Sequence, residues 1–163
     1  MTAVFGVRRW ANFFRHRWWE QLAFMPTWLL LGIAKLAICT LSFERVAAGL
    51  GTSLGPHAFV PLGSASQSLC ARRISRLVLW VARYTPWDSD CFPQALVARF
   101  MLGLGGVPWA LCFGLERGAD ELMQAHAWVV CGRVNVTGGA SFGRYAVVAC
   151  FTSLSEAQLA RAP

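Results

Sequence analysis

The sequence predicts an α+β domain in which helices come first along the chain and antiparallel strands follow. Apolar residues recur at helical spacing in segments before residue 103, whereas short alternating runs separated by glycines follow residue 108. A chain of 163 residues has the length of one domain and can enclose a hydrophobic core. Because the helical and strand segments are grouped, we expect a layer of helices packed on one sheet.

The composition narrows the classes of function. A hydrophobic content of 56% and eight Trp are high for a soluble domain, and the net charge of +7 suggests an anionic partner or a membrane surface. The sequence has no Cys-x-x-Cys pair, no metal-ligand cluster and no phosphate-binding Gly-rich loop. We therefore expect no metal, no cofactor and no nucleic-acid partner. Six cysteines scattered through apolar runs are typical of a reduced, cytoplasmic protein.

The first part of the chain is predicted to be an N-terminal helical region, residues 1–60, attached to a core, residues 61–163, in one compact domain. Its first 20 residues are aromatic and basic. They fit either a helix docked on the domain or a surface that meets a membrane or a partner protein. The aromatic residues that can share one helical face are Trp10, Phe13, Phe14 and Trp18.

A strongly apolar run covers residues 27–43. It is shorter than the roughly 20 residues that span a bilayer, and Lys35 near its middle would be costly in lipid. We therefore predict a buried helix rather than a membrane span. Residues 49–66 are rich in Gly and Pro and are predicted to be a loop, and residues 67–84 resume a helix.

Cys91 is the first candidate for chemistry because it stands at the predicted start of a helix. Pro93 is tolerated in a first helical turn, and residues 94–102 place apolar groups at helical spacing. The unpaired N–H groups and the positive dipole end at that position favour a thiolate. Gln94 could close a reciprocal cap or donate to a developing oxyanion.

His126 is the second candidate, on a strand further along the chain. Residues 126–131 alternate and are β-rich, residues 134–137 form the predicted return strand, and two glycines then break it. Whether the turn centres on Cys131-Gly132 or on Gly132-Arg133 is open. A Cys and a His at this spacing fit a thiol nucleophile with its base, but they also fit a buried thiol and a core histidine.

Short motifs around these two residues carry a resemblance to a known family. They are Pro86-Trp87, Cys91, Gln94-Ala95-Leu96, Gly105-Gly106-Val107-Pro108, Gly114-Leu115 and Ala125-His126-Ala127-Trp128-Val129. Together they resemble the lasso-peptide biosynthesis B2 family, whose members are transglutaminase-like (papain-like) cysteine peptidases that remove the leader from a lasso-peptide precursor. The resemblance covers about residues 26–152. It implies a catalytic helix packed on an antiparallel sheet.

The resemblance also implies a role for each site residue. Cys91 would attack the scissile carbonyl, and His126 would take the thiol proton and later protonate the leaving amine. A backbone N–H at the helix start would hold the oxyanion, with Gln94 as a second donor. Trp128 is expected to wall the cleft.

The third catalytic residue is where the sequence departs from the family. Many relatives supply an Asp on the strand after the His strand, but residues 134–143 contain no Asp or Glu. In either hairpin register His126, Asn135 and Thr137 are expected on one sheet face. We choose Asn135 to orient His126 through its amide oxygen, with Thr137 second. The alternative is a Cys91–His126 dyad, with Asn135 an edge polar residue.

The resemblance implies three partners: the leader of a lasso precursor, a separate leader-recognition (RRE) protein and the macrolactam-forming cyclase. A separate recognition protein is expected because residues 1–60 lack the alternating strands of a recognition domain. Two other functions stay open: a different Cys–His acyl transfer such as amide ligation, and a non-catalytic, membrane-associated scaffold.

Overall fold

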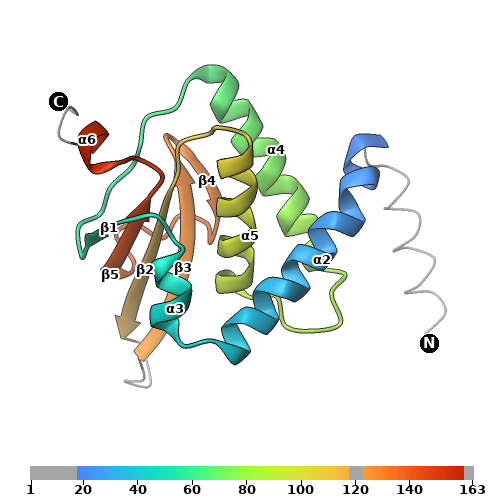
Figure 1. Ribbon diagram of the computed structural model, residues 1–163, viewed down its shortest axis with the longest axis horizontal. Coiled ribbons are helices and arrows are strands. Elements are labelled where there is room, and N and C mark those ends of the chain that lie inside the picture. The colour runs from blue at the N-terminus through green and yellow to red at the C-terminus, as the bar shows by residue number, and fades with distance from the viewer. Residues whose placement is uncertain (1–17, 118–122, 160–163) are drawn as a thin grey trace.

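The computed structural model describes residues 18–117 and 123–159 and confirms the α+β class. One five-stranded antiparallel sheet has the order β1-β5-β2-β3-β4, and the long helices cover one of its faces (Figure 1). The strands are β1 (Thr52–Gly55), β2 (Ala110–Arg117), β3 (Met123–Cys131), β4 (Val134–Thr137) and β5 (Ala146–Thr152). The helices are α2 (Trp18–Thr40), α3 (Phe43–Ala48), α4 (Ala65–Ala82), α5 (Cys91–Leu104) and α6 (Glu156–Leu159).

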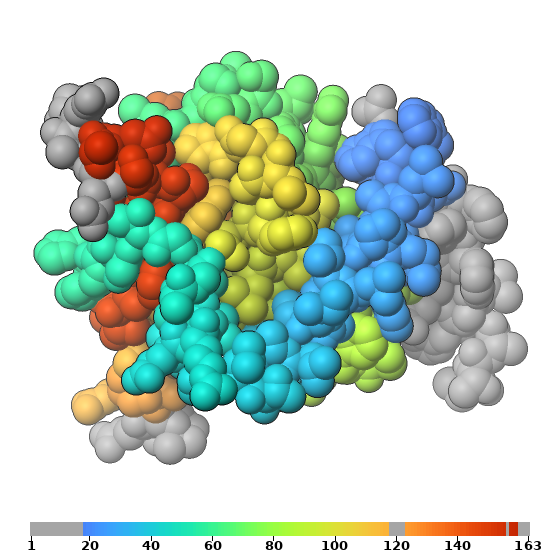
Figure 2. All heavy atoms as spheres, viewed as in Figure 1, coloured from blue at the N-terminus to red at the C-terminus, as the bar shows by residue number. Residues whose placement is uncertain are grey.

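Strand alternation sorts the buried side chains into two clusters. Leu111, Val129 and Val136 belong to the large core shared with the helices, whereas Cys112 and Trp128 belong to a smaller cluster. In the space-filling view α5 lies at the centre of the helical face, with α4, α2 and α3 around it (Figure 2). The sheet and the helices around α5 therefore hold the N-terminal end of α5 in place.

Helix α2 corrects the prediction of a buried helix over residues 27–43. It begins earlier, at Trp18, and packs one side against α4 and α5 while its other side is exposed. Of the described helices, α2 alone is long and apolar enough to cross a membrane. Length and composition do not by themselves establish a membrane span, because core helices of soluble proteins pass the same test. The exposed apolar residues of α2 are Trp18, Leu22, Met25, Leu29, Ile33 and Leu36. The aromatic and basic residues 1–17 lie outside the described part of the chain.

Strand β1 was not predicted, because its Gly- and Pro-rich surroundings indicate a loop. It pairs with the edge of β5, so a strand of the sheet lies inside the range predicted to be helical, residues 1–60. Gly51 before it has a φ of 102°, and a Cβ there would lie 2.5 Å from the carbonyl oxygen of Thr152. The close approach of the two chains therefore depends on glycine.

Two contacts attach α2 to the segment that leads into α5. The ring of Trp28 lies 4.7 Å from that of Trp87, and Gly32 leaves the space that the Trp87 ring fills. The indole of Trp28 also donates a hydrogen bond of 3.4 Å to the carbonyl of Tyr84. The apolar N-terminal helix thus supports the chain just before Cys91.

Candidate active site

Cys91 is the first residue of α5, as the position of Pro93 predicts. Asp90 precedes it with extended backbone and makes no side-chain cap, so the first turn of the helix keeps free N–H groups near the thiol. The thiol is partly exposed and packs against the edge of the main core. A helix N-terminus stabilises a nearby thiolate, which is the ionised form that attacks carbonyl carbon.

Gln94 holds the loop that precedes the cysteine. Its side-chain nitrogen donates a hydrogen bond of 2.6 Å to the carbonyl of Ser89, whose hydroxyl lies 2.9 Å from that of Thr85. The reciprocal cap that the sequence suggested is therefore replaced by a bond to the loop. The carboxamide has a second N–H, and its use toward an oxyanion stays a prediction.

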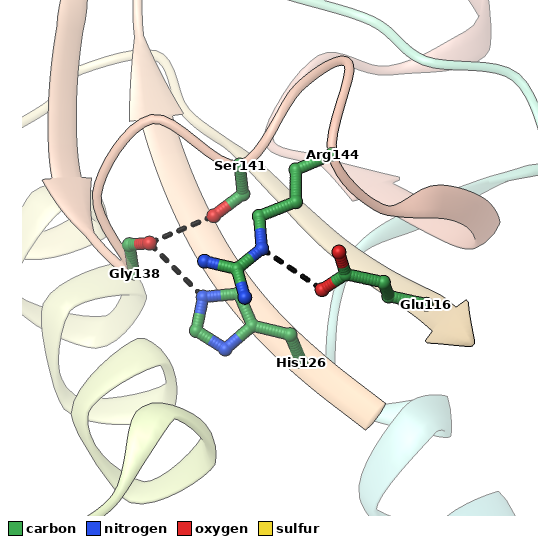
Figure 3. Close-up of polar contacts among 5 residues, drawn as sticks. All are labelled: Glu116, His126, Gly138, Ser141 and Arg144. Atoms are coloured by element: carbon green, nitrogen blue, oxygen red, sulfur yellow. Dashed lines mark hydrogen bonds and ion pairs between the residues drawn. The ribbon is translucent and has the colours of Figure 1, made fainter. Parts of the chain in front are cut away.

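The ring of His126 is fixed by two kinds of contact. Its Nε2 lies 3.0 Å from the carbonyl oxygen of Gly138, which also accepts a 2.7 Å hydrogen bond from the Ser141 hydroxyl (Figure 3). The ring stacks on Tyr145 at 4.7 Å and more distantly on Trp128 at 6.0 Å. A carbonyl oxygen only accepts, so Nε2 carries the proton of the neutral ring and Nδ1 is left as the base.

The Gly138 carbonyl is a functional group that sequence reasoning missed. Strand β4 pairs with β3 only at residues 129–131, and the chain then approaches β3 closely at Gly138. Gly138 has a φ of 79°, and a Cβ there would lie 2.4 Å from the Cβ of Trp128. The two consecutive glycines after β4 were the available signal, because a glycine that ends a strand also permits such an approach.

Neither Asn135 nor Thr137 is hydrogen-bonded to His126. The hairpin turns at Gly132-Arg133, which pairs Asn135 with Val130 as that register predicts. Asn135 is exposed and lines a different surface hollow, beside arginines of α4. A register shift in β4 then places Thr137 opposite Val129 instead of Trp128, and its buried hydroxyl makes no hydrogen bond to any described residue.

Trp128 also differs from its predicted role. It is fully buried behind His126 and does not line the cleft. Its ring meets Phe142 edge-on at 5.4 Å, and its six-membered ring fills the space that Gly114 leaves open on β2. Trp128 therefore stacks on the imidazole from the protein interior. The prediction that it walls the cleft is wrong.

The carboxylate of Glu116, on the strand beside β3, is engaged with Arg144. The two side chains form an ion pair of 2.8 Å (Figure 3). The guanidinium also lies 5.3 Å from the centre of the Tyr145 ring. The hydrogen bond to Glu116 raises the pKa of Arg144 further. No carboxylate among the described residues is hydrogen-bonded to the His126 ring.

A single pocket of about 540 Å³ is lined by both Cys91 and His126. The structure therefore brings the two predicted catalytic residues to one cavity, while no hydrogen bond joins the thiol to the imidazole within residues 18–117 and 123–159. Those residues also contain no group of three metal-binding side chains. The pocket therefore contains a thiol and helix N–H groups of the kind used in acyl transfer, while the His126 ring stacks on Tyr145 and Trp128 of the smaller cluster.

Comparison with protein families places residues 37–150 in the Transglutaminase-like superfamily. The match covers well over half of the chain and includes both Cys91 and His126, so the protein belongs to this superfamily. Its members are usually cysteine-dependent enzymes. Comparison with curated proteins and with solved structures gives no match.

Proposed function

We propose that the protein is a cysteine peptidase that removes the leader from a lasso-peptide precursor. The observation that carries the proposal is the presence of Cys91, at the start of α5, and His126 in one pocket of a transglutaminase-like domain. The lasso precursor is proposed as the substrate because the order of the surrounding motifs resembles that of the lasso B2 family. All six cysteines are free thiols, which supports a reducing cytoplasmic location.

In the proposed reaction the Cys91 thiol gives its proton to Nδ1 of His126, and the sulfur bonds to the scissile carbonyl carbon. The C–N bond then breaks, and the leaving amine takes the proton from the imidazolium. Water adds to the resulting thioester, which releases the carboxylate of the leader and restores the thiol. The His126 ring contacts Gly138, Tyr145 and Trp128 and is not hydrogen-bonded to the thiol, so the proposed reaction requires the ring to turn toward Cys91 in the substrate complex.

The hydrogen bond of His126 determines which of its two ring nitrogens carries the proton in the neutral ring. The Gly138 carbonyl holds the proton on Nε2 and thereby keeps Nδ1 available as the base. A carbonyl dipole stabilises an imidazolium less than a carboxylate does, so the Cys91–His126 ion pair should be weaker than in an Asp-bearing relative. The helix N-terminus compensates on the thiolate side.

The experiment mixes the purified protein with a lasso precursor, with and without a separate leader-recognition protein, and measures product masses. Hydrolysis yields a free leader and a core peptide whose masses sum to the precursor plus one water. Ligation to an added amine would instead yield a leader amide, which is the mass signature of the alternative acyl transfer. Cys91→Ala should abolish product formation, whereas Cys39→Ala, at an exposed cysteine on α2, should not. Turnover by Cys91→Ala would overturn the proposal.

A further inference from the structure

The pocket beside Cys91 has walls of one chemical kind. Apart from Cys91 and His126, each described residue that lines it is apolar. The larger wall residues are Phe43 on α3, Phe92 on α5, Phe113 and Leu115 on β2, and Val148 on β5. Because the described lining residues include no Asp, Glu, Lys or Arg, they offer a charged side chain no partner, and burial of an unpaired charge is strongly unfavourable.

Two of the walls are large apolar side chains with unusually high exposure. Phe43 is 49% exposed and Val148 is 47% exposed, so both would gain burial if an apolar group filled the pocket that they line. Exposed apolar surface gathered in a concave site is a recurrent mark of ligand binding. The pocket has a volume of about 540 Å³. This volume exceeds what one aromatic side chain fills and leaves room for part of a peptide backbone.

The aromatic walls are arranged as an edge-to-face cluster. The ring of Phe113 lies 5.3 Å from that of Phe43 and 5.0 Å from that of Phe92, at interplanar angles of 86° and 87°. Aromatic pairs favour this geometry, and another ring can join the cluster in the same way. Arg99 secures the Phe43 wall by donating a hydrogen bond to the carbonyl of Gly49, which caps α3.

We propose that this pocket is the subsite for an uncharged, apolar side chain, aromatic or branched aliphatic, on the acyl portion of the substrate. The inference rests on the proposed function, because it takes Cys91 as the nucleophile. The acyl portion is assigned because it stays bonded to the Cys91 sulfur after the amine has left, and Cys91 itself lines the pocket. Apolar contacts there act in both steps of the reaction.

The test uses four N-acetyl amino-acid chloromethyl ketones, which carry a Phe, Leu, Ala or Asp side chain on the acyl side. The thiolate displaces chloride, and peptide mass spectrometry gives the rate at Cys91 and, within the same molecule, at exposed Cys39. We expect the Phe and Leu reagents to alkylate Cys91 at least about ten-fold faster than the Ala reagent, after division by the rates at Cys39. The Asp reagent should be slower than the Ala reagent.

Variants of the walls sharpen the test. Phe43→Ala and Val148→Asn should each reduce the Phe-over-Ala preference several-fold, because each removes apolar contact from the filled pocket. Val60→Asn is the matched control, since Val60 is 40% exposed and does not line the pocket, and it should keep the wild-type preference. Thermal unfolding of each variant checks that the fold is retained.

Two outcomes separate this subsite from the proposed function. Equal rates for the Phe and Ala reagents at a reactive Cys91 would overturn the subsite and leave the nucleophile in place. If iodoacetamide, which has no side chain to fit, reacts no faster at Cys91 than at Cys39, the nucleophile itself is refuted. In that case saturation-transfer NMR with N-acetyl-phenylalaninamide against N-acetyl-alaninamide, for wild type and Val148→Asn, still decides the subsite: equal signals for the two amides would overturn it.

Discussion

Cys91 and Cys112 are two cysteines of one small domain in contrasting surroundings. Cys91 is partly exposed at a helix N-terminus and opens into a pocket. Cys112 is fully buried on β2, opposite Cys150 on β5, with the two sulfur atoms 3.1 Å apart. The hydrogen bond that Cys112 donates to Cys150, and burial, both raise the pKa of Cys112. The comparison teaches that placement at a helix end beside a pocket, rather than the presence of a cysteine, makes Cys91 the candidate nucleophile and Cys112 a core residue.

Thiol alkylation tests this contrast most directly and has the largest expected effect. At neutral pH and limiting iodoacetamide, Cys91 should react at least about a thousand-fold faster than Cys112, because a buried thiol reacts only when the fold opens. Time-resolved peptide mass spectrometry measures both sites in one sample. After unfolding in urea the two rates should converge within a few-fold. A native Cys112 that reacts as fast as Cys91 would contradict the comparison.

The carbonyl that fixes His126 can be removed from its place by a single methyl group. Gly138→Ala adds a Cβ that collides with Trp128, on top of the strain of a positive φ, and should cost about 2 to 4 kcal/mol of unfolding free energy. Gly139→Ala is a matched control, since Gly139 also has a positive φ, 69°, but a Cβ there meets nothing within 4 Å. It should cost about 1 to 2 kcal/mol.

Urea denaturation measures both costs, and precursor cleavage by the folded fraction of each variant measures the catalytic effect. We expect Gly138→Ala to lose at least ten-fold in cleavage rate and Gly139→Ala to stay within about two-fold of wild type. If the two variants cleave alike, the Gly138 carbonyl does not position the base.

A buried thiol also makes stability depend on pH. Burial, and secondarily the nearby Cys70, raises the pKa of Cys131 above its usual 9.0. In the unfolded chain this thiol ionises near that pH, whereas in the folded chain it ionises only at higher pH. The unfolding free energy should therefore be level below about pH 8 and fall as the pH rises through 9 and beyond. Cys131→Ala should flatten this fall relative to Cys39→Ala, as urea denaturation at several pH values would show; equal slopes would contradict it.

How much of the structure can be predicted from the sequence depends on whether a feature is determined by the local sequence pattern or by tertiary contacts. The position of Cys91 follows from Pro93 and the helical spacing behind it, and the His126 strand follows from alternation; both are local. The orienting group of His126 could not be predicted in the same way, because it is a backbone carbonyl, which leaves no side-chain signature. Its place is set by a β4 register shift and by the contact of Gly138 with Trp128.

The same distinction explains the errors at the edges of the fold. Strand β1 is a sheet edge only because β5 accepts it, and a Gly- and Pro-rich segment gives no local sign of that pairing. Helix α2 has apolar residues on all sides, so its sequence does not reveal which side is buried. The packing of Trp87 against Gly32 selects that side.

The smallest expected effect concerns Asn135, which the sequence favoured as the orienting residue. Were its amide to hold the imidazole, Asn135→Ala would lower the cleavage rate about ten- to a hundred-fold, equivalent to roughly 1.4 to 2.7 kcal/mol. The structure gives that contact to Gly138 and leaves Asn135 exposed opposite Val130. We therefore expect Asn135→Ala to cleave within about two-fold of the wild-type rate. Thr137→Ala, at a buried position, should lower stability more than it lowers the rate of the folded enzyme. Single-turnover cleavage at saturating precursor separates these cases, because it isolates the bond-breaking step from leader affinity. A ten-fold or larger loss in Asn135→Ala with unchanged unfolding free energy would show that β4 shifts in the substrate complex to bring Asn135 against His126.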